Sequence, residues 1–184
     1  MDSNTANSGA TVGGVGGLLL YDPDPGSVVS NNVFKVNGTN VYSGGLGLEN
    51  SMTADNTVLV ENNYFIDNEA KHGGAISTFS IPVILQNNVF SGNQAGIYGG
   101  GIYFSNQLAL FSPNKLSNNS FSGNTADSKG GAVYIFSNSW SETVIINSVF
   151  WANSANTGAE IYVPAGYPVE LAHCNIDPAK IWGT

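Results

Sequence analysis

Short apolar stretches recur along this chain at a nearly constant spacing, and similar polar phrases separate them. Each repeat contains the phrase Asn-Asn-x-Phe-x-x-Asn-x-Ala or a close variant of it. The phenylalanines of this phrase are separated by 31, 25, 31 and 29 residues, and they are Phe34, Phe65, Phe90, Phe121 and Phe150. A period of this size indicates a solenoid or another array of repeated units.

A glycine-rich phrase follows each phenylalanine phrase and leads into an apolar stretch. Apolar residues alternate there, as Ile102 and Phe104 do, and this alternation is typical of a β-strand. No window of about 11 residues has the pattern of an amphipathic helix. The glycine phrases are SGGLGL (43–48), GGAIST (73–78), GGGIYF (99–104), GGAVYI (130–135) and GAEIYV (158–163). We therefore predict two or three short strands in each period.

These patterns predict an all-β fold, a right-handed single-stranded parallel β-helix of about six coils with roughly 29 residues per coil. Leucine-rich and ankyrin-type repeats would need a helix or a dense leucine lattice. Equivalent strands would stack about 4.8 Å apart, which gives a rod of roughly 30 Å. We expect one domain over residues 1–184, with the repeat region at about 16–176 and irregular ends at 1–15 and 177–184.

The repeat also predicts which side chains face the interior. The phenylalanines should form one aromatic stack along the rod. The asparagines three residues before them should form an internal ladder of amides bonded from coil to coil, and they are Asn31, Asn62, Asn87, Asn118 and Asn147. The asparagines that follow, Asn32, Asn63, Asn88 and Asn119, suit a tight bend because asparagine tolerates positive φ. His173 would replace one rung of the ladder.

The glycine pairs should mark a tight corner. A corner needs freedom in φ, and a larger side chain there would clash with the coils above and below. The second position of the pair is always small, and it reads Gly74, Gly100, Gly131 and Ala159.

Paired in this way, the two phrases resemble the passenger region of chlamydial polymorphic outer membrane proteins. They are also similar to right-handed β-helix proteins of the pectin-lyase-like superfamily. The motifs are GGAI (73–76), GGGI (99–102) and GGAV (130–133), with FKVN (34–37), FIDN (65–68), FSGN (90–93), FSGN (121–124) and FWAN (150–153). The resemblance covers roughly residues 16–163 and implies an extracellular or surface-displayed protein, often an adhesive one.

Charged residues are scarce. The chain has five lysines, no arginine and 13 acidic residues, which give a formal net charge of −8. Such a surface offers no basic patch to phosphates, so we expect no nucleic-acid partner. No run approaches about 20 apolar residues, so we expect no membrane insertion by this chain. Cys174 is the only cysteine, which excludes an intrachain disulfide.

We expect no catalysis and no cofactor. Lyases of the pectin-lyase-like superfamily typically use an Arg or Lys base with carboxylates that hold Ca²⁺. Hydrolases need carboxylates about 5–9.5 Å apart. The chain has no arginine, and Asp67 and Glu69 align with no other acidic residue. Asp22 and Asp24, in the phrase DPDPG, are candidates for a structural Ca²⁺ site. A plain turn is the alternative there.

Aromatic residues are the candidate ligand-binding groups. Trp140 lies in the variable segment SNSWSE (137–142), and loops on a rigid scaffold commonly carry function. Tyr103, Tyr134 and Tyr162 should form an outward column beside the glycine corner. This column could bind a glycan, or its rings could simply stack from coil to coil.

The ends of the rod allow more than one kind of binding partner. No amphipathic capping helix is evident, and bare solenoid ends expose unpaired strand edges. The chain is therefore part of a longer rod, or its terminal segments fold over the ends, or subunits stack end to end. The functions that remain are a structural or adhesive surface protein, a filament subunit that binds itself, and a polysaccharide-binding or polysaccharide-degrading protein. The expected partner is accordingly a second copy or a surface glycan or protein.

Overall fold

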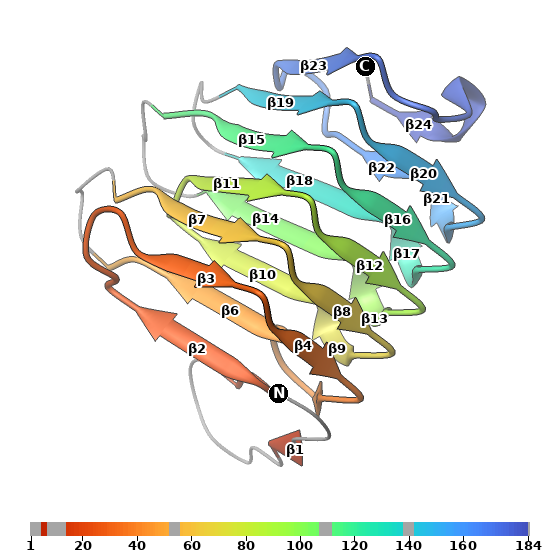
Figure 1. The fold of residues 1–184 in the computed structure, drawn as a ribbon. Coiled ribbons are helices and arrows are strands. Elements are labelled where there is room, and N and C mark those ends of the chain that lie inside the picture. Colours follow the sequence, from red (N-terminus) through yellow and green to blue (C-terminus); the bar gives the residue numbers. More distant parts are fainter. Residues whose placement is uncertain (1–4, 7–13, 52–55, 107–111, 138–141, 184) are drawn as a thin grey trace.

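The computed structural model describes residues 5–6, 14–51, 56–106, 112–137 and 142–183. The chain winds into a right-handed parallel β-helix of about five turns with about 29 residues per turn (Figure 1). The fold prediction is thus confirmed, with about five turns in place of six. A degenerate sixth copy of the phenylalanine phrase, AHCNI at residues 172–176, leads into the terminal segment and does not open another full turn.

Each full turn contributes four strands, which align with those of the next turn into four sheets of parallel strands, and these are named here A to D. Sheet A holds β4 (Val33–Lys35), β8 (Tyr64–Ile66), β12 (Val89–Ser91), β16 (Ser120–Ser122) and β20 (Val149–Trp151). Sheet B holds β1 (Thr5–Ala6), β5 (Gly38–Thr39), β9 (Glu69–His72), β13 (Gln94–Tyr98), β17 (Thr125–Lys129) and β21 (Ser154–Thr157).

Sheet C holds β2 (Leu18–Tyr21), β6 (Leu46–Glu49), β10 (Ile76–Phe79), β14 (Ile102–Asn106), β18 (Val133–Ser137), β22 (Ile161–Tyr162) and β24 (Ile181–Trp182). Sheet D holds β3 (Val28–Ser30), β7 (Val58–Glu61), β11 (Val83–Gln86), β15 (Asn114–Ser117), β19 (Thr143–Ile146) and β23 (Val169–Ala172). A short 3-10 helix, η1 (Pro178–Lys180), precedes β24. The prediction of two or three strands per period was too low, because the polar strands of sheet B show little apolar alternation.

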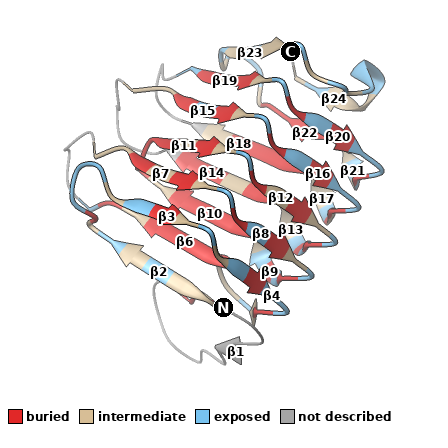
Figure 2. Cartoon of the chain, viewed as in Figure 1, coloured by how far each residue is buried: buried red, intermediate tan, exposed pale blue. Residues whose placement is uncertain are grey.

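Identical positions of successive turns lie directly over one another. Phe34 pairs with Phe65, Phe65 with Phe90, Phe90 with Phe121, and Phe121 with Phe150. The ring centroids are 4.6 to 5.0 Å apart and the rings are nearly parallel. All five rings are buried. The predicted aromatic stack is therefore confirmed, and it forms part of the continuous core inside the four sheets (Figure 2).

The predicted asparagine ladder was wrong by one residue. Asn31, Asn62, Asn87, Asn118 and Asn147 are exposed and adopt φ between 49° and 58°. The rungs are instead the following asparagines, since Asn63 donates through Nδ2 to Asn88 Oδ1 at 3.1 Å, and Asn88 likewise to Asn119. The strand ends at the left-handed residue, so the in-out alternation counted from the preceding strand does not continue through it. The next side chain therefore turns inward.

The same shift moves His173. It is exposed with φ of 54°, so it occupies the bend position, and the prediction that it is a rung was wrong. Cys174 stands in the rung position, as Ser148 does one turn earlier. Its thiol donates to the carbonyl oxygens of Ile145 and Ala172, both at 3.4 Å. Asn63 makes the equivalent pair of bonds through Nδ2, to the carbonyls of Val29 and Glu61.

A second internal ladder, which the sequence analysis missed, uses the last residue of the FxxN motif. Asn37, Asn68, Asn93, Asn124 and Asn153 are all at most 4% exposed. From each turn to the next, Nδ2 donates to Oδ1 at 2.8 to 3.0 Å. Nδ2 also donates to the carbonyl of a phenylalanine in the turn below, as in Asn93 to Phe65. The two ladders satisfy the polar groups on either side of the phenylalanine stack.

The glycine corner is confirmed. The first glycine of the pair adopts positive φ, 67° at Gly99. At the second, Gly100, an added Cβ would lie 2.3 Å from the carbonyl oxygen of Thr125 and 2.4 Å from that of Gly131. The backbone of the next turn therefore excludes any side chain there. Ala159 fits at the same position in the last full turn, where no complete turn follows.

The terminal segments extend three of the sheets by one parallel strand each. At one end β24 pairs with β22 and β23 with β19, and at the other β1 pairs with β5. Asp177 begins η1 by accepting a hydrogen bond from the backbone of Ala179 at 3.0 Å. Among the described residues, no helix has the length and apolarity needed to cross a membrane.

Candidate functional site

The three predicted tyrosines form a continuous column on the outer face of sheet C. Tyr103, Tyr134 and Tyr162 pair in register, and Trp182 continues the column. Their ring centroids are 5.4, 5.1 and 4.6 Å apart in that order, with interplanar angles of at most 15°. The ring faces are therefore taken up by neighbouring rings, as the coil-to-coil alternative predicted. Glycan binding by these tyrosines stays a prediction, limited to their edges and to the outer face of Trp182.

A second column from sheet B packs against the first. Tyr42, His72 and Tyr98 follow one another, and the Tyr98 ring lies 4.6 Å from that of Tyr134. Lys129 extends this column, with its Nζ 4.6 Å from the centroid of the Tyr162 ring and 3.1 Å from its hydroxyl oxygen. The two columns bury each other, which leaves Tyr134 only 7% exposed.

This burial changes the acid–base properties of the columns. Desolvation raises the pKa of Tyr134 well above its usual value, and it also raises the pKa of Tyr103. Desolvation lowers the pKa of His72 to about 4, and the positive charge of Lys71 adds to the effect. All three groups are therefore neutral at neutral pH, and none is poised to exchange a proton there.

The other predicted site residues do not gather into a site. Trp140 lies outside the described residues. The two carboxylate oxygens of Asp22 accept hydrogen bonds from the backbone and hydroxyl of Ser51, at 2.6 and 2.7 Å. Asp24 is exposed, and its carbonyl accepts from Ser27. Within the described part of the chain, no three His, Cys, Asp or Glu residues come close enough to hold a metal ion together. A Ca²⁺ ion at Asp22 and Asp24 stays a prediction.

A cavity of about 450 Å³ opens at the C-terminal end of the rod. It lies between the last full turn and the segment that returns toward β24. Its lining combines residues of that turn with residues of the returning segment, and these are Phe150, Trp151, Ala152, Glu160, Asn175, Ile176, Asp177 and Lys180. Ile176 stands at the sequence position where a sixth phenylalanine would continue the stack, two residues after the rung position of Cys174. The cavity thus adjoins the end of the aromatic stack.

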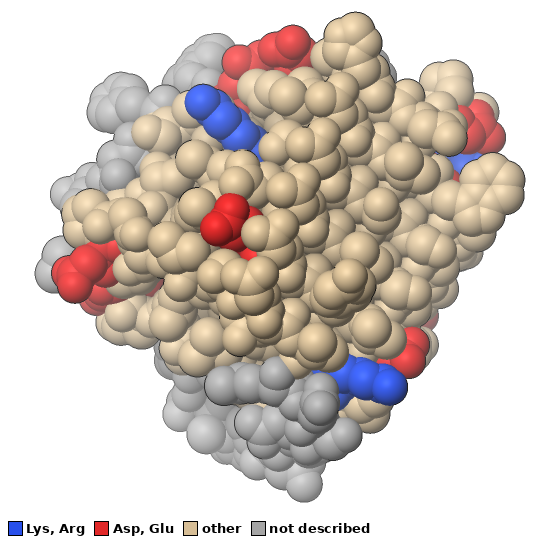
Figure 3. All heavy atoms as spheres, in the orientation of Figure 1, with Lys and Arg blue, Asp and Glu red and all other residues tan. Residues whose placement is uncertain are grey.

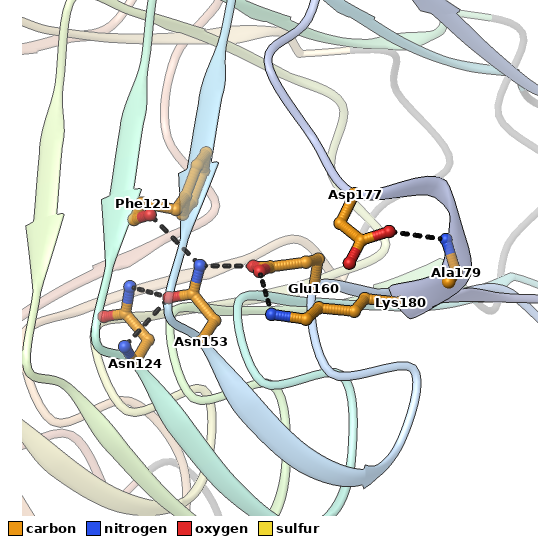
Figure 4. Close-up of polar contacts among 7 residues, drawn as sticks. All are labelled: Phe121, Asn124, Asn153, Glu160, Asp177, Ala179 and Lys180. Carbon is orange, nitrogen blue, oxygen red and sulfur yellow. Dashed lines mark hydrogen bonds and ion pairs between the residues drawn. The ribbon is translucent and has the colours of Figure 1, made fainter.

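Glu160 closes the second asparagine ladder at this end. Its Oε2 accepts a hydrogen bond of 2.5 Å from Nδ2 of Asn153, the last asparagine of the ladder (Figure 4). The carboxylate thus replaces the amide oxygen that a further turn would supply. Its Oε1 lies 3.7 Å from Nζ of Lys180 on the returning segment. The Glu160 side chain is 1% exposed and that of Lys180 is 42% exposed, so the ion pair joins the core to the surface.

Glu160 fits because only a partial turn follows it, in which the carbonyl of Lys180 accepts from the Glu160 backbone at 3.1 Å. It occupies the third position of the glycine phrase, which is Gly45, Ala75, Gly101 or Ala132 in the turns before it. Both alanines are 0% exposed, so this position holds at most one carbon inside the rod. The longer side chain of a glutamate there would overpack the core and collide with the following turn.

Trp151 is the second departure from the repeat at this end. In the same register position of sheet A, the other turns have Lys35, Ile66, Ser91 and Ser122. Trp151 is 70% exposed, the largest value among the exposed large hydrophobic residues described. No other ring of the described residues stacks on it, so its indole is more accessible than the rings of the tyrosine columns.

The sequence analysis missed this cavity, although two signals were present. Glutamate replaces a small residue in GAEI, and tryptophan replaces lysine, isoleucine or serine in FWAN. Neither change was singled out from the sequence. Their proximity became visible only when the path of residues 173–183 over the end of the rod was known.

Comparison with known proteins identifies the fold family. The family model described as the right handed beta helix region matches residues 25–176, which is most of the chain. No curated protein and no solved structure is found to match it.

Proposed function

The chain belongs to the right-handed β-helix family, and on this premise we propose that it is a non-catalytic extracellular or cell-surface protein with a structural and adhesive role. The observation that carries the proposal is that the repeated residues form the core, whereas the residues that differ from turn to turn lie on the surface or at the end of the rod. The repeated asparagines and phenylalanines are buried and bonded from turn to turn, which makes a stiff rod. The residues that break the repeat are free to make contacts.

The surface of the rod supports an adhesive role. Charged side chains are few and isolated in the view of Figure 3. On the outer face of sheet A, Val33, Tyr64 and Val89 are consecutive in one register column, and Val33 and Tyr64 are 41% and 51% exposed; Ser120 separates them from Val149. Exposed apolar patches of this kind often mark interaction sites. The resemblance to the passenger region of chlamydial polymorphic outer membrane proteins points to the same role.

We propose no chemical reaction. The acidic side chains that the repeat brings to the surface stand singly, as Asp67 and Glu69 do beside Gly92 and Gln94 of the next turn. The carboxylates Glu160 and Asp177 lie together at the C-terminal cavity, but each already accepts a hydrogen bond within the fold. These bonds favour a structural or binding use of the two groups.

The open strand edges favour a second candidate function, that of a filament subunit. Among the described residues, β21 is the last strand of sheet B, and β3 and β4 are the outermost strands of sheets D and A at the opposite end, whereas the edge of β20 is partly covered by Asn175. Strand edges without a neighbour can pair with another chain. End-to-end pairing of this kind is heterologous and would propagate into a fibre.

Three measurements test these functions. Beads coated with the purified protein should adhere to cell surfaces or extracellular matrix, and beads coated with the unfolded chain should not. The absence of adhesion to every surface would contradict the adhesive role, and turnover of neutral or acidic polysaccharides would contradict the non-catalytic one. Electron microscopy at high protein concentration separates the candidates, because fibres would establish the filament and dispersed single rods would exclude it.

A further inference from the structure

The C-terminal cavity is where the chain departs most from its own repeat. Trp151 stands where the two preceding turns have serine, Glu160 stands where they have glycine or alanine, and Asp177 and Lys180 belong to a segment outside the repeat. All four line the same cavity. A scaffold alone would need a short apolar side chain at the end of the phenylalanine stack. Charged and aromatic groups gathered there indicate a use beyond stability.

The lining has two kinds of surface. Phe150 and Ile176 supply apolar walls, and Trp151 supplies an exposed indole. Glu160 and Asp177 can accept hydrogen bonds, whereas the ammonium of Lys180 can donate them. A cavity of about 450 Å³ with apolar walls and a few converging polar groups has the form of a small-molecule site.

The geometry of the ion pair leaves room for hydrogen bonds to a ligand. Lys180 Nζ and Glu160 Oε1 are 3.7 Å apart, beyond the usual length of a direct hydrogen bond. A ligand hydroxyl beside the pair, not between its two atoms, can accept from the ammonium and donate to the carboxylate. Asp177 uses Oδ1 for the backbone of Ala179, and a carboxylate has further lone pairs for a second donor.

The charge of the cavity limits which small molecules can bind in it. Two carboxylates and one ammonium give the cavity a formal charge of −1, on a chain whose net charge is −8. An acidic ligand would be repelled. The strand of a second copy is also a poor occupant, because the Glu160 side chain already fills the place of the next ladder residue.

We propose that this cavity binds one uncharged sugar unit, either free or at the end of a glycan, with its apolar face on Trp151 and its hydroxyls on Glu160, Asp177 and Lys180. The inference rests on the proposed adhesive function and names the ligand class of that function. It places the contact at the tip of the rod, away from the tyrosine columns, whose ring faces are already occupied.

A glycan array with neutral, amino and acidic members tests the inference, followed by titration calorimetry with the methyl glycoside of the terminal sugar that binds. The test variant is Trp151→Ser, which installs the residue found at Ser91 and Ser122 in the same column. The matched control is Tyr21→Ser, because Tyr21 is also an exposed aromatic residue and lies on β2, the first strand of sheet C at the opposite end of the rod. Neither change should alter the unfolding midpoint, since both side chains are largely exposed.

The inference predicts binding to neutral glycans, a loss of about tenfold or more in affinity for Trp151→Ser, and no change for Tyr21→Ser. Equal binding of Trp151→Ser and the wild type would overturn the cavity as the site. Binding restricted to acidic or amino glycans would overturn the ligand class. Adhesion of coated beads without binding to any glycan would overturn the inference while leaving the adhesive function intact.

Discussion

The middle of the rod and its C-terminal end use the same positions for different residues. Asn93 is bonded to Asn68 on one side and to Asn124 on the other, whereas Asn153 has Asn124 on one side and the carboxylate of Glu160 on the other. Phe90 lies between two rings, but Phe150 stacks on one ring and faces a cavity. The next turn therefore dictates which side chain a position accepts, and its absence at the end permits chemistry that the middle excludes.

The largest effect on stability is expected from exchanging the residues found at the third position of the glycine phrase in the middle and at the end of the rod. Ala132→Glu places a glutamate where Ala132 is 0% exposed and a full turn follows. The buried charge and the overpacking should cost about 4 to 8 kcal/mol of unfolding free energy, enough to prevent folding. The reciprocal change, Glu160→Ala, should cost only about 1 to 3 kcal/mol, through the lost acceptor of Asn153. Chemical denaturation measures both, and a tolerated Ala132→Glu would contradict the account.

The next largest difference in stability between the two regions is expected from truncating phenylalanines of the aromatic stack. Phe90→Ala should lower the unfolding free energy by about 3 to 5 kcal/mol, because it leaves a cavity between two rings. Phe150→Ala should cost clearly less, since that ring has one stacking partner. Guanidinium unfolding of both variants gives the difference. Equal losses would mean that the stack is not stabilised from both sides.

The two asparagines of one phrase should behave differently. Asn93→Ala removes a ladder residue and leaves the buried amides of Asn68 and Asn124 short of partners, at a cost of about 2 to 3 kcal/mol. Asn87→Gly changes an exposed residue with φ of 55°, a conformation that glycine adopts without strain, so it should be nearly neutral. A large loss for Asn87→Gly together with a small one for Asn93→Ala would restore the ladder first predicted.

That ladder shows where inference from the sequence succeeds and where it fails. The phenylalanine and glycine columns could be predicted because each residue has one conformational role at its position. Adjacent asparagines could not be assigned, because both are polar and either tolerates the bend. Asn31 and its equivalents end the strand, and this bend resets which side chains face inward. The cavity was beyond prediction for another reason: it depends on the path of a terminal segment that lies outside the repeat.

The pH dependence of stability should show a smaller effect, located in the aromatic columns. The folded pKa of His72 is about 4, below its ordinary value of 6.5. Between these values the unfolded chain takes up a proton that the folded protein does not, so stability falls as the pH is lowered through this window. His72→Phe should lose this component, because phenylalanine does not titrate. Unfolding midpoints of the two proteins at about pH 7 and about pH 4.5 test it, and equal acid sensitivity would contradict the assignment.

The central claim is that repeated residues build the rod and that the departures from the repeat at its C-terminal end make the contacts. Nuclear magnetic resonance of the isotope-labelled protein, titrated with the neutral glycan that binds best on the array, tests it most directly. The account predicts changes in the indole signal of Trp151 and in the side-chain signals of Asn175 and Lys180, with the amides of Asn88 and Asn93 unmoved. Changes confined to Tyr103, Tyr134 and Tyr162, or spread along the middle of the rod, would contradict it.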